Sequence, residues 1–248
     1  MIAIVTGATG DIGTEFVKSL LGEVDAIWAV GRSTEKLDAL VSSFGPEIVP
    51  VRTDLSDKSD VLALCQKISE AAPEIKYLVN NAGTGKMAPV SEFSTAEIDS
   101  LLEINMVAAT LLCRAAIPFM VKGSYILNIC SASAFQPNPY ISLYSASKSY
   151  LLSFTRSLNV ELSDVTCTAV CPGWVDTKML SKMHDGKEVK YPGIVTAKKV
   201  VDDAIRDAKK GRDVSVCSSY NRCLRFYSKI MPHRLVMKQW VKGIKDYV

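Results

Sequence analysis

The sequence predicts an α/β protein in which seven parallel strands form one sheet between two layers of helices. Three observations predict this class. Apolar runs of five to seven residues alternate with segments of helical periodicity along most of the 248 residues. The runs are apolar throughout, which is typical of strands covered on both faces. A glycine-rich turn directly follows the first run and opens a helical segment.

The expected elements alternate in order along the chain. Strands are predicted at residues 2–6, 26–30, 47–52, 76–80, 124–130, 165–170 and 213–217. Helices are predicted at residues 11–21, 34–43, 57–71, 95–120, 140–161 and 197–210. Long connections in compact domains are usually functional, so we interpret residues 178–193, within the Gly-, Pro- and Lys-rich segment 171–195, as a substrate lid. Residues 1–217 then form one domain, and residues 218–248 form a tail.

Composition and charge narrow the class further. The chain is 48% hydrophobic and 22% charged, as globular proteins are. No apolar run reaches the roughly 18 residues of a membrane-spanning helix, and a strand begins at Ile2, so we expect no signal peptide. Seven cysteines without a Cys-x-x-Cys pair suit reduced thiols in the cytoplasm rather than a zinc site. The net charge of +3 carries no nucleic-acid signature.

The first strand ends in Thr-Gly-Ala-Thr-Gly-Asp-Ile-Gly, residues 6–13. Glycines at this spacing let the backbone turn tightly and approach a pyrophosphate at the helix N-terminus. The turn therefore predicts a Rossmann-type dinucleotide site. Its expected members are Gly7, Thr9, Gly10, Asp11, Ile12 and Gly13. Because a carboxylate near a pyrophosphate is unfavourable, we expect Asp11 to point away and cap the helix.

The ends of the next two strands indicate which dinucleotide binds. Arg32 follows the second strand, where an acid would bind the ribose 2′-hydroxyl of NAD. An arginine there can instead pair with the 2′-phosphate of NADP, although a solvated arginine is the alternative. Asp54 and Leu55 follow the third strand. We place both in the cofactor site, where Asp54 either bonds an adenine amino group or caps the next helix.

A tyrosine and a lysine stand four residues apart where the helix after the fifth strand begins. Tyr144 and Lys148 would share one helix face, one turn apart. A nearby ammonium favours the phenolate, so Lys148 is predicted to lower the pKa of Tyr144 toward neutrality. The pair is common by chance, and it is informative here because cofactor motifs precede it.

These motifs, together with Asn-Asn-Ala-Gly at residues 80–83, resemble the short-chain dehydrogenase/reductase family, in its shorter branch. Ser131 precedes Tyr144 by thirteen residues, the family's serine–tyrosine separation, and Tyr144-x-x-x-Lys148 is its defining motif. Asn105 stands where the family carries an active-site asparagine on a helix. The segment Pro-Gly-Trp-Val-Asp-Thr, residues 172–177, resembles the one that closes over the nicotinamide. The resemblance covers about residues 1–216.

The resemblance implies an NADPH-dependent oxidoreductase that transfers a hydride between nicotinamide and a ketone, aldehyde or secondary alcohol. Tyr144 would be the general acid or base, Lys148 would also hold the nicotinamide ribose, and Ser131 would bind the substrate carbonyl. Asn105 would hold a water that links Lys148 to solvent. The further cofactor residues implied are Asn81, Ala82, Gly83, Pro172, Gly173, Val175 and Thr177. The family also implies a small-molecule substrate and a homodimer or homotetramer.

Two alternatives stay open beside this interpretation. The glycine spacing Gly-x-x-Gly-x-x-Gly resembles the family's extended branch, which would suggest a sugar-nucleotide epimerase or dehydratase. The length of the chain leaves no room for a second substrate domain, which disfavours that alternative. The other alternative is a catalytically idle scaffold that senses cofactor or associates with a membrane. The presence of all four expected catalytic side chains argues against it.

The C-terminal segment 218–248 differs in charge from the rest of the chain. It has seven basic residues and one acid, a charge of +6 that leaves −3 for the remainder. Val236, Trp240, Ile244 and Tyr247 form an apolar stripe at helical spacing. Such a stripe between basic residues suits either peripheral membrane contact or packing on the body, on a subunit or over the substrate pocket. Either case would suit a hydrophobic substrate, such as a steroid, an acyl chain or a lipid-derived ketone.

Overall fold

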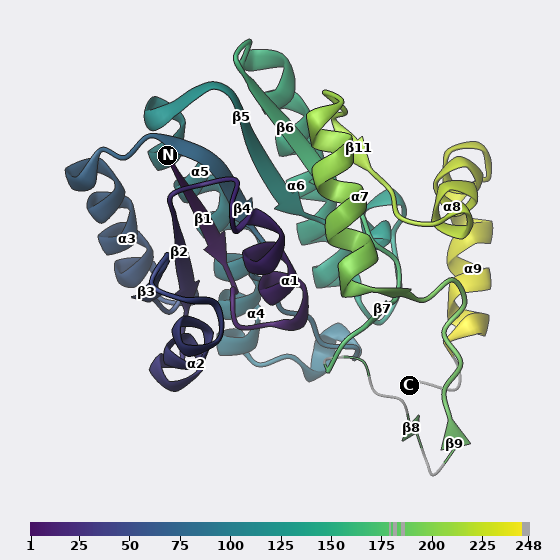
Figure 1. Cartoon of the computed structure of the whole chain (residues 1–248). Helices are drawn as coiled ribbons and strands as arrows, with labels where there is room; N and C mark the ends of the chain where they lie inside the picture. The colour runs from purple at the N-terminus through teal and green to yellow at the C-terminus, as the bar shows by residue number, and fades with distance from the viewer. Residues whose placement is uncertain (179, 181–182, 185–186, 245–248) are drawn as a thin grey trace.

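The computed structural model describes residues 1–178, 180, 183–184 and 187–244, and it has the predicted three-layer Rossmann architecture (Figure 1). Seven parallel strands form one sheet in the order β11-β6-β5-β4-β1-β2-β3. Their bounds are Ile2–Thr6 (β1), Ala26–Gly31 (β2), Ile48–Arg52 (β3), Ile75–Asn80 (β4), Met120–Ile129 (β5), Val165–Val170 (β6) and Val214–Ser215 (β11). The predicted seven-stranded parallel sheet is confirmed.

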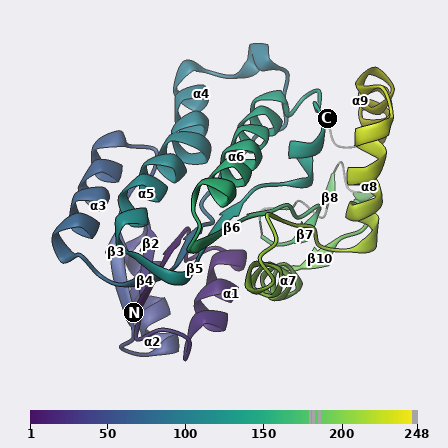
Figure 2. The ribbon, with the colours of Figure 1, turned by 90° about the horizontal axis from the view of Figure 1, so that it is seen from above.

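Helices cover both faces of this sheet (Figure 2). One face carries α1 (Asp11–Leu20), α2 (Thr34–Phe44) and α7 (Ala197–Lys209). The other carries α3 (Lys58–Ala71), α4 (Thr95–Leu102), α5 (Ala109–Ala116) and α6 (Ser142–Glu161). Successive side chains of β1 pack into the two helix layers alternately, because neighbouring side chains of a strand point to opposite faces of the sheet. Ala3 and Val5 pack beneath α1 and α7, whereas Ile4 packs toward α3 and α5.

The single helix predicted at residues 95–120 is interrupted in the structure. Between α4 and α5 lies a π-helical turn, Glu103–Ala108, and a short 3₁₀ turn, Ile117–Phe119, follows α5. Pro118, which lacks a backbone N–H, lies in that last turn and helps to end the helix. The strand β5 consequently starts at Met120, four residues earlier than predicted. The π-helical turn matters for the site, as described below.

By length and hydropathy, Thr95–Phe119 is apolar enough to cross a membrane, which the sequence interpretation did not expect. Length and composition alone do not distinguish such a span from a helix of a protein core. In the structure this segment belongs to the helix layer, and the side chains of Leu112 and Cys113 are fully buried with those of α3 and the sheet. Its apolar face is therefore explained by packing within the fold.

Short strands border and occupy the segment predicted as a lid. The two-residue strands β7 (Val175–Asp176) and β10 (Val195–Thr196) pair in parallel, so the segment predicted as a lid leaves and rejoins the body at adjacent points. Between them β8 (Met183–His184) and β9 (Lys187–Glu188) form an antiparallel pair. The lid prediction also covers residues 179, 181–182 and 185–186, which lie outside the described residues.

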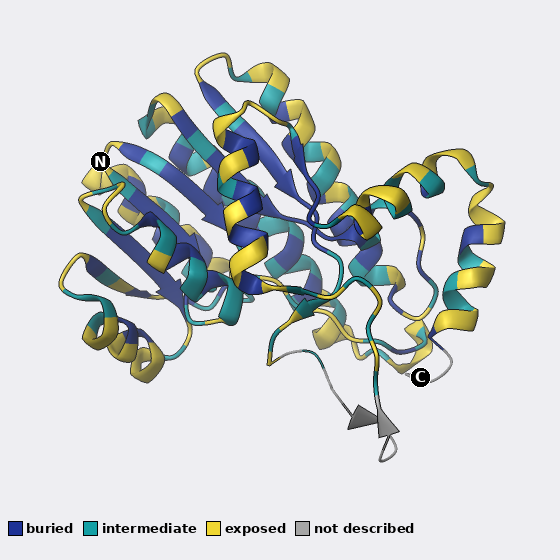
Figure 3. Cartoon of the chain, turned by 45° about the vertical axis from the view of Figure 1, so that its right-hand side comes forward, coloured by how far each residue is buried: buried dark blue, intermediate teal, exposed yellow. Residues whose placement is uncertain are grey.

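The tail forms two helices, α8 (Ser219–Ile230) and α9 (His233–Gly243), at one end of the molecule (Figures 1 and 3). The Tyr227 hydroxyl and Gln239 Oε1 are 2.8 Å apart and join the two helices. Val236 and Ile244 are each 3% exposed, so the α9 part of the predicted stripe packs inward. Tyr247 lies outside the described residues. The outward surface of the tail is largely exposed and includes Phe226.

A buried polar ladder fixes α6 to the sheet. Asn80 Nδ2 donates to Asn128 Oδ1 at 2.8 Å, and Asn128 Nδ2 donates to Thr155 Oγ1 at 2.8 Å. These residues belong to β4, β5 and α6, and each is at most 3% exposed. Buried polar groups are costly unless they are hydrogen-bonded, so the ladder specifies one position of α6 over the sheet.

We expect Asn128→Ala to lower the free energy of unfolding by about 2–4 kcal/mol, because it removes the shortest bond of the buried Asn80 amide and the donor to Thr155 Oγ1, and leaves a cavity in their place. Urea unfolding followed by circular dichroism measures the loss. The matched control is Gln66→Ala, which removes an exposed amide bonded to Glu70 and should cost about 0.5 kcal/mol or less. Equal losses in the two variants would contradict the role of the ladder.

Candidate active site

The carboxyl ends of the parallel strands meet at one edge of the sheet, where the predicted cofactor turn lies. Gly7 follows β1 with φ +61°, a left-handed conformation that favours glycine. At Gly13 a Cβ atom would lie 2.1 Å from the carbonyl oxygen of Gly7. A side chain at position 13 would therefore push α1 away from the turn. Gly10 occupies the N-cap position of α1.

Asp11 does not cap α1, contrary to the expectation from the sequence. The N-cap residue is Gly10, which supplies no side-chain hydrogen bond, and Asp11 is the first helical residue. Asp11 Oδ2 instead accepts a hydrogen bond from the backbone N–H of Lys178 at 2.7 Å. The carboxylate thus points away from the turn, as expected, and joins α1 to the start of the lid.

This turn fits a dinucleotide pyrophosphate on its own geometry. The first N–H groups of a helix have no partner within the helix, and here no capping side chain covers them. A pyrophosphate would accept from these groups and from the positive end of the α1 dipole. The close approach at Gly13 keeps the turn free of side-chain bulk. Thr9 and Ile12 lie within the same turn and first helical turn.

The turn is tied to the end of β4 by residues that the sequence interpretation partly missed. Asn81 Nδ2 donates to the carbonyl oxygens of Thr6 and Gly7 at 3.0 and 3.1 Å. The Thr6 hydroxyl oxygen accepts from the backbone N–H groups of Asn81 and Ala82 at 3.0 and 3.1 Å. Asn81 and Ala82 were predicted, but the role of Thr6 was not. In the sequence, the only indication of this role is that Thr6 directly precedes the first glycine of the turn.

Arg32 and Asp54 lie together at the ends of β2 and β3. Arg32 is exposed, and its charge contributes to holding the pKa of Asp54 below the ordinary value. The larger cause of that lowered pKa is the hydrogen bond from Ser56, whose hydroxyl lies 2.7 Å from Asp54 Oδ1. The helix-cap alternative for Asp54 is wrong, because Asp57 is the N-cap of α3. Leu55 is buried beside this pair.

Ser131, Tyr144 and Lys148 converge beyond the end of β5. Ser131 lies close enough to Tyr144 for its hydroxyl to influence the pKa of the phenol, and its Oγ accepts from the backbone N–H of Ser133 at 3.1 Å. Lys148 is 3% exposed, and its Nζ donates to the carbonyl oxygen of Ile129 at 2.7 Å. The same Nζ lies 5.7 Å from the centre of the Tyr144 ring. A hydroxyl, a phenol and an ammonium thus occupy one small region.

The proton affinities of this cluster differ from the prediction. Burial raises the pKa of Tyr144 above its ordinary value, and the nearby Ser131 hydroxyl opposes that rise. Burial also lowers the pKa of Lys148. The predicted lowering of the Tyr144 pKa by Lys148 is therefore wrong for this arrangement. The physical reason is that the ammonium bonds the Ile129 carbonyl and faces the tyrosine ring.

Asn105 lies in the π-helical turn and reaches the same region. Its Oδ1 accepts from the Thr84 N–H at 2.9 Å, and its Nδ2 donates to the Thr84 carbonyl at 2.8 Å. The Nδ2 group also donates to Ser147 Oγ at 3.0 Å. The extra residue of a π-turn aims this side chain at the loop after β4. Sequence reasoning missed Thr84 and Ser147, because the partners come from distant parts of the chain.

Two glycines in that loop make room for the cluster. A Cβ atom at Gly83 would lie 3.1 Å from Lys148 Nζ, and one at Gly85 would lie 2.8 Å from Tyr144 Cδ2. Backbone therefore approaches both side chains where a side chain would displace them. Gly83 was predicted as a cofactor residue, whereas Gly85 was not singled out.

The segment 172–177 closes the site on the lid side. The carbonyl oxygen of Pro172 accepts from the N–H of Ala132 at 2.7 Å, next to Ser131. Gly173 packs so closely on α8 that a Cβ atom would lie 2.4 Å from Asn221 Oδ1. Val175 pairs with Val195 in β10. The carbonyl of Thr177 accepts a bond from the N–H of Leu180, so Thr177 begins a turn into the lid.

Aromatic side chains from the lid and the tail meet beside this segment. The Trp174 ring lies 4.7 Å from that of Tyr191 and 6.4 Å from that of Trp240, measured between centroids. Trp240 Nε1 donates to the carbonyl oxygen of Pro139 at 2.9 Å. Pro139 lies in the loop that connects Ser131 to Tyr144. The tail helix α9 is therefore joined directly to the loop that carries the cluster.

The fold and the site together define the class of protein. A glycine turn built for a dinucleotide and a serine–tyrosine–lysine cluster share the carboxyl edge of one Rossmann sheet. A family model described as short chain dehydrogenase matches residues 1–188. The chain belongs to the short-chain dehydrogenase family of oxidoreductases.

Individual relatives support this membership. The chain is 32% identical to the 2-(R)-hydroxypropyl-CoM dehydrogenase of Xanthobacter autotrophicus over 205 residues, which cover 76% of this chain and 80% of the relative. A short chain dehydrogenase from Burkholderia cenocepacia, solved with NADP, matches with a TM-score of 0.80 and 26% identity over 97% of each chain. A short-chain dehydrogenase from Sphingobium yanoikuyae, solved with NADPH, matches with a TM-score of 0.77 and 26% identity over 87% of each chain.

We expect Gly85→Ala to reduce kcat by about tenfold or more, since small displacements of reacting groups cost rate steeply and the new methyl group must move the Tyr144 ring. The rate is measured on any substrate that the wild-type protein turns over. Gly243→Ala is the control, because among the described residues no atom outside its chain neighbours and its own helix backbone lies within 4 Å of the added Cβ. An unchanged kcat in Gly85→Ala would show that the ring position is not critical.

Proposed function

We propose that this protein is an NADP-dependent carbonyl reductase, or in reverse an alcohol dehydrogenase. Hydride transfer would link the nicotinamide with a ketone, an aldehyde or a secondary alcohol. The observation that carries the proposal is the convergence of Ser131, Tyr144 and Lys148 at the sheet edge that also holds the glycine turn. Family membership and relatives solved with NADP or NADPH support the same chemistry.

NADPH, when bound, supplies the hydride, and the protein's own side chains handle the proton and the orientation. Tyr144 donates a proton to the carbonyl oxygen in reduction and accepts one in oxidation. Like any tyrosine, the phenol is protonated at neutral pH and can therefore donate. Ser131 lies close to Tyr144, so one carbonyl oxygen could accept from both hydroxyl groups.

Lys148 and Asn105 support Ser131 and Tyr144 without contacting the substrate carbonyl. The ammonium of Lys148 is held by the Ile129 carbonyl, close to the backbone of Gly83, and would bind the nicotinamide ribose hydroxyls. Asn105 positions the loop after β4 through its bonds to Thr84, and it contacts α6 through Ser147. These bonds occupy the side-chain amide, so a water held by Asn105 would use its backbone carbonyl or an additional site on Oδ1.

We place the rest of the cofactor along the carboxyl edge of the sheet. The pyrophosphate lies on the turn formed by residues 7–13, and the adenosine lies toward Asp54 and Leu55. Arg32 is exposed beside Asp54 and can pair with a 2′-phosphate in a bidentate manner. Residues 172–177 enclose the nicotinamide, as their contact with Ala132 next to Ser131 supports.

The substrate that we propose has an apolar body. The rings of Trp174, Tyr191 and Trp240 form an aromatic cluster beside the loop that carries Ser131 and Tyr144. Aromatic side chains offer large apolar contact areas in binding sites. A steroid, an acyl chain or a lipid-derived ketone fits this environment. The sugar-nucleotide and scaffold alternatives find no support in the relatives, and we do not propose them.

Assembly and location follow the same proposal. We propose a homodimer or homotetramer, because the family resemblance implies one. The seven free thiols favour the cytoplasm, and we place the protein there. Peripheral membrane contact through the α9 stripe is not part of the proposal, because Val236 and Ile244 pack inward and Trp240 bonds the body.

We expect Tyr144→Phe to lower kcat at least about 100-fold, because general acid catalysis contributes roughly that factor or more. NADPH affinity, measured by fluorescence titration, should stay within about threefold, since less than 0.7 kcal/mol of binding would be lost. Steady-state NADPH consumption across a panel of steroid, acyl and quinone carbonyls measures the rate.

Tyr150→Phe is the matched control on the same helix. Its hydroxyl lies 2.9 Å from Thr110 Oγ1, no lysine follows four residues later, and its loss should leave kcat nearly unchanged. Full activity of Tyr144→Phe on every accepted carbonyl would contradict the proposed mechanism.

We expect Arg32→Ala to weaken NADPH binding by about 10- to 100-fold, because a charge-assisted hydrogen bond contributes about 1.5–3 kcal/mol. NADH has no 2′-phosphate, so its dissociation constant should change little. Isothermal titration calorimetry with both cofactors measures the difference. Arg114→Ala removes an exposed arginine on α5 and serves as the charge control. Equal affinity of the wild-type protein for NADPH and NADH would rule out the assignment of Arg32.

A further inference from the structure

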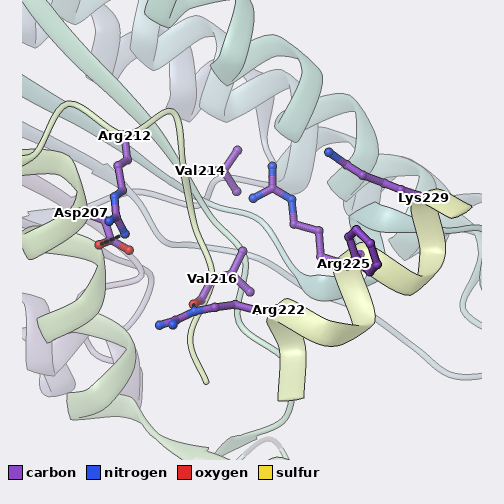
Figure 4. A pocket seen from close by; sticks show the side chains of 8 residues that line it. Asp207, Arg212, Val214, Val216, Arg222, Arg225 and Lys229 are labelled. Carbon is purple, nitrogen blue, oxygen red and sulfur yellow. Dashed lines mark hydrogen bonds and ion pairs between the residues drawn. The ribbon is translucent and has the colours of Figure 1, made fainter. Parts of the chain in front are cut away.

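A pocket lies away from the cofactor turn, between the β11 edge of the sheet and α8. It has a volume of about 280 Å³ and is lined by four basic side chains. Arg222, Arg225 and Lys229 come from α8, and Arg212 comes from the turn before β11 (Figure 4). The wall between them is Val214 and Val216. We call this cavity the basic pocket.

The sequence of α8 places its three cations together. Positions 222, 225 and 229 are spaced by three and four residues, so they share one helix face. Figure 4 shows the guanidinium of Arg225 and the ammonium of Lys229 pointing into the space beside Val214. Like charges repel at such proximity, and an arrangement of this kind is stabilised by a bound anion. The described part of α8 and α9 contains no acidic residue to take that role.

The one carboxylate that lines the pocket is already neutralised by Arg206, which is outside the lining, and by Arg212, one of the four pocket cations. Asp207 Oδ1 lies 3.0 Å from both Arg206 Nη2 and Arg212 Nη1. Asp207 Oδ2 accepts from Ser215 Oγ at 2.8 Å. Asp207 is 2% exposed, so these partners saturate a buried carboxylate. It therefore does not compensate the charges of α8.

The α8 cations have only weak or neutral partners among the described residues. Arg222 Nε donates to the Val216 carbonyl at 3.3 Å, which leaves its terminal nitrogens free to bind. Arg225 stacks over the Phe135 ring at 5.5 Å. No described carboxylate pairs with Lys229. Guanidinium forks match the oxygens of phosphate, and an ammonium adds a point charge.

The position of the pocket separates it from the cofactor site. In the sheet order, β11 is at one edge, whereas Arg32 and Asp54 follow β2 and β3 at the opposite edge. The 2′-phosphate of NADP and a ligand of the basic pocket would thus bind at opposite ends of the sheet. The 2′-phosphate of NADP would therefore not compensate the charges of α8.

We propose that the basic pocket binds a phosphate group, carried either by a soluble phosphate ester or by a lipid headgroup. Arg225 and Lys229 form the centre of the site, with Arg222 at one side. Phe226 lies at the rim and is 67% exposed, so it offers an apolar surface to the rest of the ligand. The proposal does not depend on the catalytic function proposed above.

Pyrophosphate binding to the NADPH-loaded protein tests the proposal. Because NADPH occupies the glycine turn, the pyrophosphate binding that is measured cannot come from that turn. Isothermal titration calorimetry at about 20 mM salt should detect binding, because weak screening preserves charge attraction. The double variant Arg225→Gln/Lys229→Gln should weaken it at least about tenfold, the effect of losing one or more charge-assisted bonds.

The control is Arg234→Gln/Lys238→Gln, which removes the same charge from exposed positions on α9. It should change pyrophosphate affinity less than about threefold, since exposed charges that make no direct contact with the ligand contribute little. Circular dichroism and NADPH affinity confirm that each variant is folded. If calorimetry detects no pyrophosphate binding at about 1 mM ligand, the dissociation constant is weaker than about 1 mM and the proposal is overturned. Equal weakening in both variants also overturns it, because diffuse charge would then explain the binding.

Vesicle sedimentation distinguishes the two sources of phosphate. Phosphatidylcholine vesicles with and without phosphatidic acid are mixed with wild-type protein and with both double variants. Sedimentation that requires phosphatidic acid and is lost only in Arg225→Gln/Lys229→Gln assigns the lipid headgroup. No sedimentation, with pyrophosphate still bound, assigns a soluble phosphate ester. Equal phosphatidic-acid-dependent sedimentation of all three proteins contradicts a specific pocket.

Discussion

The burial of one ammonium group organises the candidate active site. Lys148 is almost fully buried, and taking a cation out of water is costly unless hydrogen bonds replace the water. The bond to the Ile129 carbonyl supplies one replacement, and the backbone of Gly83 leaves the space. Helix α6 must then stay at a fixed height above the sheet, which the Asn128–Thr155 bond ensures. The π-helical turn aims Asn105 at the same loop.

The tail is part of this arrangement, although it lies at the end of the chain. Trp240 bonds the Pro139 carbonyl, Arg225 stacks on Phe135, and Gly173 accommodates Asn221. Each contact falls on a segment next to Ser131 or Tyr144. The tail therefore joins the loops around the site through Trp240 and turns a set of cations toward the sheet edge at β11. The face of α8 that carries these cations is basic, whereas the inward face of α9, which carries Val236, is apolar.

Much of the fold and of the site could be predicted because the signals are local. The glycine spacing at residues 7–13 and the Tyr144–Lys148 interval are read within one or two helical turns. The errors occur where distant groups meet. Asn105, in the interrupted helix, bonds Thr84 and Ser147, and Asp11 bonds Lys178, 167 residues later. No local pattern carries that information.

The sequence by itself determined the alternation of strands and helices, the parallel sheet and the set of reactive residue types, because hydrophobic period and turn chemistry are short-range properties. Only the tertiary structure decided how those groups interact. It placed the Lys148 ammonium on a carbonyl rather than beside the Tyr144 hydroxyl, so burial rather than charge dominates the pKa of Tyr144. It also gathered Arg222, Arg225 and Lys229 against the sheet edge. Burial and electrostatic fields depend on distances between remote segments, which the folded chain alone defines.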